Sequence, residues 1–472
     1  MRTENKTKKK KHRLNTKKFI RFAAFIIVIA AAAAVLFWPV DVPVPEIPEE
    51  PEPVYKRISI AAAGDIMAHM PQVEAAKKAD GTYDFDDSFK YVKTYLESAD
   101  LSLANIETTF SGDGTYSGYP GFDSPDNLAT DVSELGIDVA WFANNHMLDT
   151  KLAGAKRTAE LLRQNGMTVV GARLSTDEDR FAVVEKNGLK IGIVAYTYET
   201  PLVNGQRTLN GSSGSGMNAG APDYINTFRY YKLDEDKKAI AADIAGCREK
   251  GAEIVICYLH WGNEYHTSPS KEDQALARYL AENGADVIFA SHPHVLQKID
   301  TISVEVDYPD EWVNPPVIEP EIPEDPLLIK IRKAIGLIKE EEPEPEPEKE
   351  PRPASWTKTV PVFYSMGNFV SNQRTESLKE TYGEDTSRRT EQGMIAQVEL
   401  CYCEDNGHID YEKISYIPTW VDRYSSGGRM NYRIIPLVEG FENNEALKTS
   451  GHTGRAKAAL AEITKTVNFP KQ

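Results

Sequence analysis

The chain has 472 residues, 41 % of them hydrophobic, so it is long enough for one large domain or two ordinary ones and is not wholly disordered. Its formal net charge at pH 7 is −17, even though ten Lys and Arg lie within residues 1–21. The acidic remainder argues against binding of nucleic acid, because a phosphate backbone is bound by fields of Lys and Arg.

The N-terminal part of the sequence predicts a membrane anchor. Residues 1–21 are cationic, and residues 22–38 form an uncharged apolar run just long enough to cross a lipid bilayer as a helix. The basic flank predicts a cytoplasmic N-terminus and an extracytoplasmic domain, which makes the chain a single-pass protein of the cell membrane. A cleaved signal peptide is the alternative. We favour the uncleaved anchor, because apolar residues 35–38 follow the small residues 30–34 where a polar mature start would be expected.

After the anchor, residues 39–54 are rich in Pro and Glu and predict an extended spacer. Residues 55–440 alternate strand-like apolar runs with helix-like stretches, which is typical of an α/β domain with right-handed crossovers. Two late strand-like runs, 394–403 and 413–420, follow one another without a helix, so part of the sheet should be antiparallel. Residues 441–472 are expected to form a C-terminal helix and tail. The helices expected within the domain are 85–99, 126–136, 153–165, 235–250 and 271–283.

An acidic, Pro- and Glu-rich insertion interrupts this pattern at residues 307–354. In its middle, residues 327–340 have the apolar spacing of a short basic amphipathic helix. We favour a solvated insertion whose helix packs on its own domain. The alternative is a helix that docks on a membrane surface or on a protein partner.

Polar residues recur where the apolar strands end, and this is the most informative feature of the sequence. The carboxyl ends of strands in open α/β sheets converge on one crevice, so these residues should share a site. Taken singly each is weak, since one His at a strand end is more often structural. The residues are Asp65, Asn105, Glu107, Asn145, His146, Asp149, His260, Glu264, His292, His294 and Asn368.

Carboxylates, imidazoles and an amide oxygen form a ligand set that suits Mn, Fe or Zn ions. An acid able to bridge two ions, with His and Asn beside it, fits a binuclear hydrolytic centre in which a bound water becomes the nucleophile. A neighbouring imidazole can donate a proton to the leaving group. Because the set contains no thiol, a purely structural zinc site is disfavoured.

Six motifs in this order resemble the CapA family of poly-γ-glutamate capsule-biosynthesis proteins. The resemblance spans about residues 57–435 without the insertion, and it implies the fold of the calcineurin-like metallophosphatases, a four-layer α/β/β/α sandwich. The motifs are GDIM at 64–67, ANIE at 104–107, NNHMLD at 144–149, HWGNEY at 260–265, SHPHVLQ at 291–297 and YSMGNFV at 364–370.

The resemblance also implies roles for the site residues. Asp65 would be the first-strand metal ligand, Glu107 the acid that bridges the ions, and Asn145 a further ligand. His260, His292 and His294 would complete the metal shell. His146 would contact the scissile group. The candidate catalytic residues are His146, Asp149 and Glu264. Asn105 and Asn368, and Glu264 as well, are expected to orient ligands or contact the substrate.

The sequence departs from the metallophosphatase pattern at two positions. Met67 stands where a ligand His is common, unless His69 substitutes for it. Ser291 stands where many relatives have His. These departures leave open whether the site holds one divalent ion or two.

The resemblance implies a part in making, exporting or tethering poly-γ-glutamate at the cell surface. The expected partners are this anionic polymer or the membrane subunits of its synthase, and the lipid bilayer through residues 22–38. A catalytic protein would be a metal-dependent hydrolase of a phosphoester or a γ-glutamyl amide. Two alternatives stay open: an extracytoplasmic phosphoesterase unrelated to capsule, and a non-catalytic subunit for assembly or polymer binding.

Overall fold

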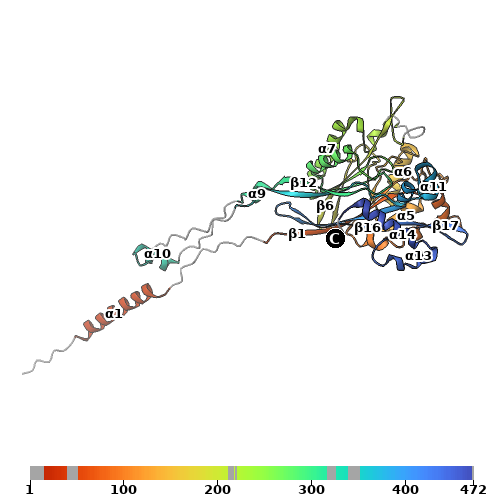
Figure 1. The fold of residues 1–472 in the computed structure, drawn as a ribbon. Helices are drawn as coiled ribbons and strands as arrows, with labels where there is room; N and C mark the ends of the chain where they lie inside the picture. The colour runs from red at the N-terminus through yellow and green to blue at the C-terminus, as the bar shows by residue number, and fades with distance from the viewer. Residues whose placement is uncertain are drawn as a thin grey trace, which may run out of the picture. The chain divides into compact units, whose positions relative to one another are not determined.

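The computed structural model forms two compact units (Figure 1). The smaller unit comprises Met1–Glu52 and Asn314–Arg352, and the larger comprises Pro53–Val313 and Pro353–Gln472. Residues 1–14, most of the spacer 39–54 and two stretches of the insertion lie outside the described residues. The structure describes residues 15–39, 52–210, 217, 220–315, 326–338 and 351–469.

The smaller unit contains the expected N-terminal helix, α1 (Thr16–Phe37), which is long and apolar enough to cross a membrane by length and composition. It begins before the uncharged run 22–38, because Lys17, Lys18 and Arg21 are good helix formers. None of its most apolar window is buried within the protein.

The same unit contains the insertion helix, α10 (Leu327–Ala334). It is shorter than the expected helix 327–340, since Gly336 takes a positive φ of 72° shortly after its last turn. Glycine adopts this conformation without strain and commonly ends a helix there.

The larger unit is built on two sheets, and the first contains β1 at its centre. β1 pairs in parallel with β2 and β14 and antiparallel with β15, as expected from the late strands that lack a helix between them. In spatial order the strands are β17 (Arg429–Pro436), β16 (Ile409–Ser426), β15 (Gln392–Cys403), β1 (Tyr55–Ile66), β2 (Leu101–Ile106), β3 (Val139–Trp141) and β4 (Thr168–Val170), with β14 (Asn368–Val370) beside β1.

In the second sheet β10 is central and runs parallel to both of its neighbours. Its strands in spatial order are β12 (Ile299–Asp307), β13 (Ser355–Phe363), β11 (Val287–Ser291), β10 (Ile254–His260), β6 (Leu189–Tyr198) and β5 (Ala182–Lys186), with β9 (Thr227–Phe228) beside β6. A separate hairpin joins β7 (Thr200–Val203) and β8 (Gln206–Thr208).

Three hydrophobic clusters separate four layers of the larger unit. Ile60 of β1 and Tyr258 of β10 both belong to the cluster between the two sheets. Ala61, the next residue of β1, faces the helices outside the first sheet, and Cys257 of β10 faces the helices outside the second. This period-2 alternation buries both faces of each sheet. The structure thus confirms the expected α/β/β/α sandwich.

The outer layers contain the helices that the sequence predicts, with one difference. Residues 85–99 form two short helices instead of one, because the Val92 N–H bonds to the Phe89 carbonyl in an i→i+3 turn that interrupts the α-helix. The helices over the first sheet are α2 (Met70–Ala76), α3 (Asp86–Phe89), α4 (Lys93–Glu97), α5 (Asn127–Glu134) and α6 (Lys151–Gln164), and those over the second are α7 (Leu233–Glu249) and α8 (Lys271–Glu282).

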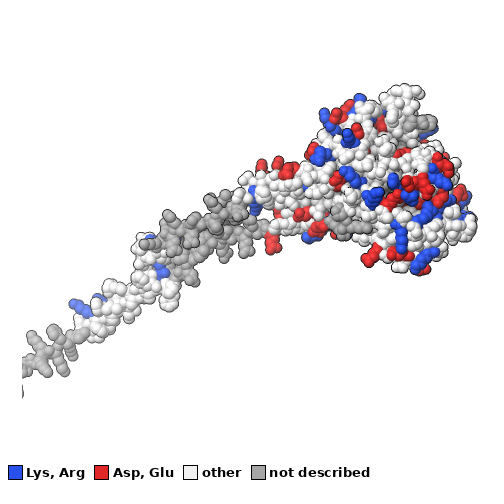
Figure 2. Space-filling model, viewed as in Figure 1, with Lys and Arg blue, Asp and Glu red and all other residues white. Residues whose placement is uncertain are grey.

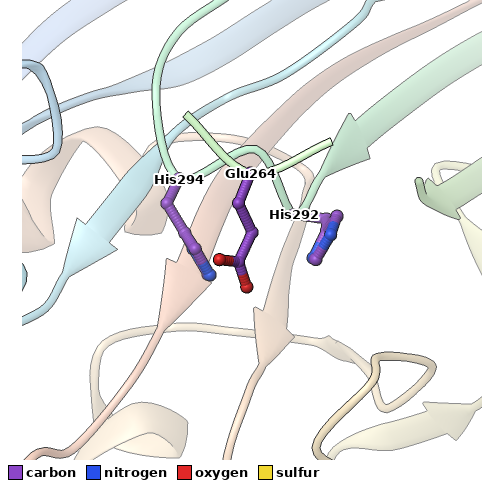
Figure 3. A group of neighbouring side chains, drawn as sticks. All are labelled: Glu264, His292 and His294. Atoms are coloured by element: carbon purple, nitrogen blue, oxygen red, sulfur yellow. The ribbon is translucent and has the colours of Figure 1, made fainter. Parts of the chain in front are cut away.

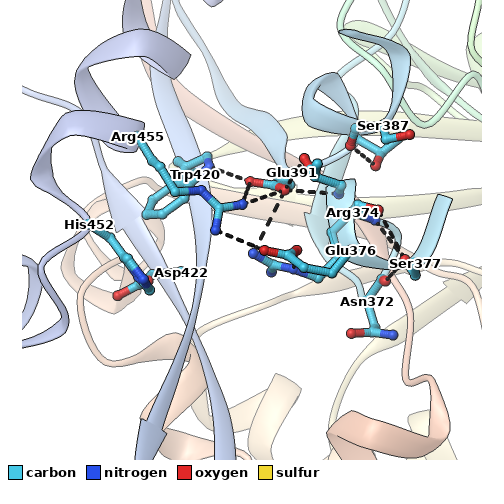
Figure 4. A network of polar contacts seen from close by, with 12 residues as sticks. Asn372, Arg374, Glu376, Ser377, Ser387, Glu391, Trp420, Asp422, His452 and Arg455 are labelled. Carbon is cyan, nitrogen blue, oxygen red and sulfur yellow. Dashed lines mark hydrogen bonds and ion pairs between the residues drawn. The ribbon is translucent and has the colours of Figure 1, made fainter. Parts of the chain in front are cut away.

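The C-terminal helices are part of the domain and not a separate tail. A buried polar network attaches α14 to the first sheet (Figure 4). Arg455 donates to both carboxylate oxygens of Glu391 at 2.8 and 2.9 Å, and Trp420 donates to the same carboxylate at 3.1 Å. The remaining helical elements are α9 (Asp310–Val313), α11 (Thr375–Tyr382), α12 (Glu384–Arg389), α13 (Glu445–Ser450), α14 (Thr453–Val467), η1 (Ala221–Asp223), η2 (Tyr230–Lys232) and η3 (Phe441–Asn443).

Gly64 allows β1 and β14 to approach closely just before Asp65. A Cβ atom at Gly64 would lie 2.1 Å from the Gly367 carbonyl oxygen, which no side chain tolerates. The backbone N–H of Asp65 bonds to that same oxygen at 3.1 Å. The close approach therefore fixes where the Asp65 side chain begins.

We expect Gly64→Ala to lower the free energy of unfolding by at least about 2 kcal/mol, because one strand must move to relieve the overlap. Gly454→Ala in α14 is the matched control, since nothing lies within 4 Å of a Cβ there. It should leave stability unchanged or raise it slightly. Chemical denaturation of both variants measures the difference, and equal stabilities would contradict the steric role of Gly64.

Candidate metal site

The polar residues at the strand ends meet in one place, as the sequence predicts. Asp65 lies near the end of β1, Glu107 directly after β2, and His260 at the end of β10. The contacts described below connect these strand ends and the loops that follow them. The predicted residues connected in this way are Asp65, Asn105, Glu107, Asn145, His146, Asp149, His260, Glu264, His292, His294 and Asn368.

Asn105 joins the two carboxylates contributed by the first sheet. Its amide nitrogen donates to Asp65 Oδ1 at 2.7 Å and to Glu107 Oε2 at 3.1 Å. Its own oxygen accepts from the side chain of Asn144 at 3.1 Å, and Asn144 also donates to the Ile106 carbonyl at 2.7 Å. Asn105 therefore has the orienting position expected of it.

His260 faces the carboxylates from the second sheet. Its Nε2 lies 3.0 Å from Asn145 Oδ1 and 3.7 Å from Glu107 Oε1. The Tyr258 hydroxyl lies 3.0 Å from its Nδ1. When that hydroxyl oxygen accepts a hydrogen bond from Nδ1–H, the lone pair of Nε2 is directed at Asn145 and Glu107.

His294 is oriented by two acceptors on its other nitrogen. Its Nδ1 lies 3.1 Å from Asn368 Oδ1 and 3.3 Å from Asp65 Oδ2, which leaves Nε2 facing Glu107 Oε1 at 3.8 Å. The Asn368 amide donates to the Thr390 carbonyl at 2.9 Å, and this bond fixes which way its oxygen points. Burial lowers the pKa of His294, but the hydrogen bond and charge of Asp65 outweigh burial and raise it above 6.5.

The turn after β11 supplies the bend that brings both of its histidines to the site. Successive side chains of an extended segment alternate in direction, so His292 and His294 need an irregular backbone between them and the strand. Both residues have positive φ, 103° and 55°. Such conformations cost free energy in non-glycine residues and are concentrated at functional sites.

Two groups of side chains at these strand ends have the spacing of metal ligands. In the first, oxygen and nitrogen atoms of Asp65, Glu107 and His260 all lie within 4.8 Å of one another. In the second, the same limit holds for Glu264, His292 and His294, the side chains drawn in Figure 3. The contact between His294 and Glu107 makes the two groups neighbours. Glu264 thus belongs to one of these two groups.

The electrostatics of the site favour a bound cation. Asp65 and Glu107 are fully buried, and their ion pairs within the described part of the chain are with histidines. Burial, followed by the charge and hydrogen bond of Asp65, raises the pKa of Glu107 well above 4.5. Two buried atoms with ligand character, Glu107 Oε1 and His292 Nδ1, have no hydrogen-bond partner among the described residues. Such atoms cost free energy unless a ligand satisfies them.

Two of the imidazoles are kept neutral. Burial lowers the pKa values of His260 and His292 well below 6.5, and the neighbouring histidines lower them further. A neutral imidazole keeps the lone pair that a metal ion binds. The donor set of carboxylate, imidazole and amide oxygen therefore fits a divalent ion.

His146 and Asp149 form a pair beside these ligands. His146 Nδ1 lies 2.7 Å from Asp149 Oδ2, and that oxygen also accepts from the Phe122 backbone N–H at 2.6 Å. The Phe122 ring packs edge-on against His146 with centroids 4.7 Å apart. The carboxylate thus orients the ring through Nδ1.

The departures at Met67 and Ser291 have different structural consequences. His69 does not replace the missing His near Met67: its Nδ1 accepts from the Asn372 backbone N–H at 3.3 Å, and neither ligand group contains it. Burial lowers the pKa of His69 to about 3. Ser291 is fully buried and lies opposite His260 in the β10–β11 register, so it occupies space beside a ligand.

Sequence reasoning missed three residues around the site. Tyr258 had a local signal, since it lies two residues before His260 and faces the same side of β10. Tyr198, whose ring is 4.6 Å from that of His292, is the last residue of β6, so its signal was the same strand-end position that marks the other site residues. Asn210, 3.2 Å from His146 Nδ1, comes from a loop with no recognisable motif.

The sequence comparison decides the family. Residues 59–373, which include every predicted site residue, match the family described as bacterial capsule synthesis protein PGA_cap. The chain belongs to this family. The resemblance inferred from the six motifs is thereby confirmed.

Other members of the capsule synthesis protein family are similar at modest identity. The capsule biosynthesis protein CapA of Bacillus anthracis is 28 % identical over 253 residues, which cover 52 % of this chain and 56 % of that protein. The PGA biosynthesis protein CapA of Bacillus subtilis is 26 % identical over 305 residues, covering 62 % of this chain and 70 % of that protein. The chain therefore spans little more than half of the first relative.

A solved structure described as a novel phosphatase of Mycoplasma pneumoniae aligns with 77 % of this chain and 94 % of its own. The TM-score is 0.36 and the identity 12 %. Similarity at this level says nothing about chemistry.

We expect the metal-free protein to lose stability as the pH rises from about 4.5 towards the raised pKa of Glu107. In that window the folded state keeps a proton that the unfolded state has released, so unfolding becomes easier as the pH rises. Glu107→Gln removes this dependence. Thermal unfolding in chelator across pH, with the exposed Glu412→Gln as control, measures it. Identical pH profiles for the two variants would contradict the assignment.

Proposed function

We propose that this chain is a membrane-anchored, extracytoplasmic protein of poly-γ-glutamate capsule synthesis with a binuclear metal-dependent hydrolytic site. The observation that carries the proposal is the pair of adjoining ligand groups around Glu107. Membership of the capsule synthesis family and the names of its relatives support the pathway. The helix α1 supports attachment to the membrane, and the cationic residues 1–21 support an extracytoplasmic domain.

The proposed ligands divide between the two groups. Asp65, Glu107, His260 and Asn145 would hold one ion, and Glu264, His292 and His294 the other, with Glu107 between them. We thus assign Glu264 to the metal shell, where it compensates for the His that is absent at Met67. Divalent Mn, Fe or Zn bound there supplies Lewis acidity and lowers the pKa of a bound water.

The remaining site residues act on protons and on orientation. His146 presents Nε2 to the leaving group and holds the proton that this group requires, while Asp149 fixes the ring through Nδ1. Asn105 orients the Asp65 and Glu107 carboxylates, and Asn368 orients the His294 ring, through hydrogen bonds. These positions suit cleavage of a phosphoester or a γ-glutamyl amide.

Aromatic side chains surround the exposed side of the site. The rings of Tyr265 and Tyr382 are 4.4 Å apart, and Tyr265 also lies 6.3 Å from His294. Tyr119 and Tyr382 are exposed. On the face of the domain seen in Figure 2, the described Lys and Arg alternate with Asp and Glu and form no continuous basic field. An anionic polymer would therefore depend on the metal ions for its attraction to the site.

Metal analysis of the full chain in detergent micelles, combined with a hydrolysis screen, tests this function. We expect two equivalents of divalent metal in the wild type and fewer in Asp65→Asn and His292→Ala. His146→Ala should keep the metal and lose turnover by about 100-fold or more, the usual contribution of a general acid. His408→Ala, remote from the site in the sheet register, is the matched histidine control.

The outcomes separate the competing functions. Bound metal with cleavage of γ-glutamyl oligomers supports the proposal, and bound metal with cleavage of phosphoesters alone supports a phosphoesterase unrelated to capsule. Bound metal without turnover supports a non-catalytic assembly subunit. A wild-type protein that binds none of Mn, Fe or Zn would overturn the metal centre itself.

Glu264→Gln tests the assignment of this residue to the metal shell. We expect the metal affinity to fall about 10-fold or more, because a neutral amide is a weaker ligand than a carboxylate. If Glu264 only contacted the substrate, metal binding measured by calorimetry would be unchanged while KM rose. Glu272→Gln, on the exposed first turn of α8, serves as the control.

A further inference from the structure

The insertion helix α10 is attached to the end of α1 through one buried arginine. Arg332 is 6 % exposed, and its Nη2 donates to the backbone carbonyls of Val35 at 2.9 Å and Trp38 at 2.5 Å. Carbonyl groups in the last turn of a helix have no partner within the helix. A cation at that end also interacts favourably with the helix dipole. Arg332 therefore caps the C-terminal end of α1.

The two helices share an apolar surface that the protein itself does not cover. Leu328 of α10 lines a cleft together with Ala31, Ala34 and Val35 of α1 and with Trp38, the residue after it. Phe37 and Trp38 are 70 and 68 % exposed. Further exposed apolar side chains of the insertion are Leu327 at 75 %, Ile331 at 41 %, Ile335 at 56 % and Leu337 at 45 %.

We propose that α10 lies in the outer interface of the lipid bilayer, beside the C-terminal end of α1, with its exposed apolar side chains among the acyl chains. This inference rests on the proposed role of α1 as the membrane anchor. A Trp at the end of a membrane-spanning helix lies at the level of the headgroups, and the Arg332 hydrogen bonds hold α10 at that same level.

The chemistry of α10 fits phospholipid better than a protein partner. Residues 326–338 contain Lys330, Arg332 and Lys333 and no acidic residue, although the insertion around them is rich in Glu. A short basic helix with exposed Leu and Ile binds in the interface through apolar burial and through attraction to anionic headgroups. The surface is also continuous with that of a helix proposed to meet lipid along its length.

A second membrane contact has a mechanical consequence. The spacer 39–54 and the insertion 307–354 would both leave the membrane surface and enter the domain at different points of the chain. Two such connections would restrict the orientations of the domain more than one connection does.

Depth measurement by spin labelling tests this placement with the full chain in nanodiscs. The four native cysteines are buried, so an introduced thiol is the accessible one. We expect a nitroxide at Ile335→Cys to collide with oxygen in preference to a polar nickel reagent, as lipid-embedded labels do. Labels at Ile27→Cys in α1 and Lys465→Cys on α14 give the deep and the aqueous reference.

Lipid composition and one pair of variants sharpen the test. Discs with phosphatidylglycerol should embed the Ile335 label more deeply than discs of phosphatidylcholine alone. Arg332→Gln should lower the ratio of oxygen to nickel collisions at the Ile335 label several-fold, towards the ratio of the aqueous reference. Lys330→Gln removes the same charge from the same helix but leaves the Arg332 hydrogen bonds, so it should produce a smaller shift.

Each contrary outcome has a distinct meaning. If the Ile27 label is deep and the Ile335 label matches Lys465, the anchor stands and the placement of α10 is wrong. If Ile27 itself is aqueous, the proposed anchoring fails and this inference fails with it. Protection of Ile335 from both oxygen and nickel would show that protein covers the helix, either a second copy of the chain or its own domain, and would overturn lipid contact.

Discussion

The structure depends on holding two carboxylates, Asp65 and Glu107, side by side in a buried site where their described ion pairs are only with histidines. Burial of like charges is unfavourable, and the protein offsets it in part by the amide of Asn105, which donates to both side chains. The raised pKa of Glu107 reflects the same cost. A bound cation would offset the rest of it.

Neither sheet contains the site alone. The first sheet contributes Asp65, Glu107 and Asn145, while the second contributes His260, Glu264 and the two histidines of the turn after β11. The two sheets therefore have to be held in a fixed relative position close to the strand ends that carry these residues. Trp141 of β3 stacks on Tyr258 of β10 with ring centroids 4.5 Å apart and planes at 11°, and Tyr258 then contacts His260. One aromatic contact thus connects the core packing to the geometry of a ligand.

The sequence predicted the layers and most of the site, because strand ends and apolar periodicity are local properties. It did not predict that Glu264 would join His292 and His294, since that grouping depends on a loop where Gly262 and Tyr265 both take positive φ. It predicted a helix in the insertion from its apolar spacing. The contact of that helix with α1 depends on Arg332 and on carbonyl groups almost 300 residues away in the sequence, and no local pattern encodes such a pairing.

The acidity of the site determines how it can serve an anionic polymer. Without ions the carboxylates of Asp65, Glu107 and Glu264 repel a polyanion, and the described surface offers no continuous basic field on the visible face to offset them (Figure 2). If the proposed centre holds two divalent ions, their positive charge exceeds that of the three carboxylates, and the site attracts anions instead. Metal occupancy would then govern polymer binding as well as chemistry. The same reversal would allow a protein with a net charge of −17 to bind the acidic polymer proposed for it.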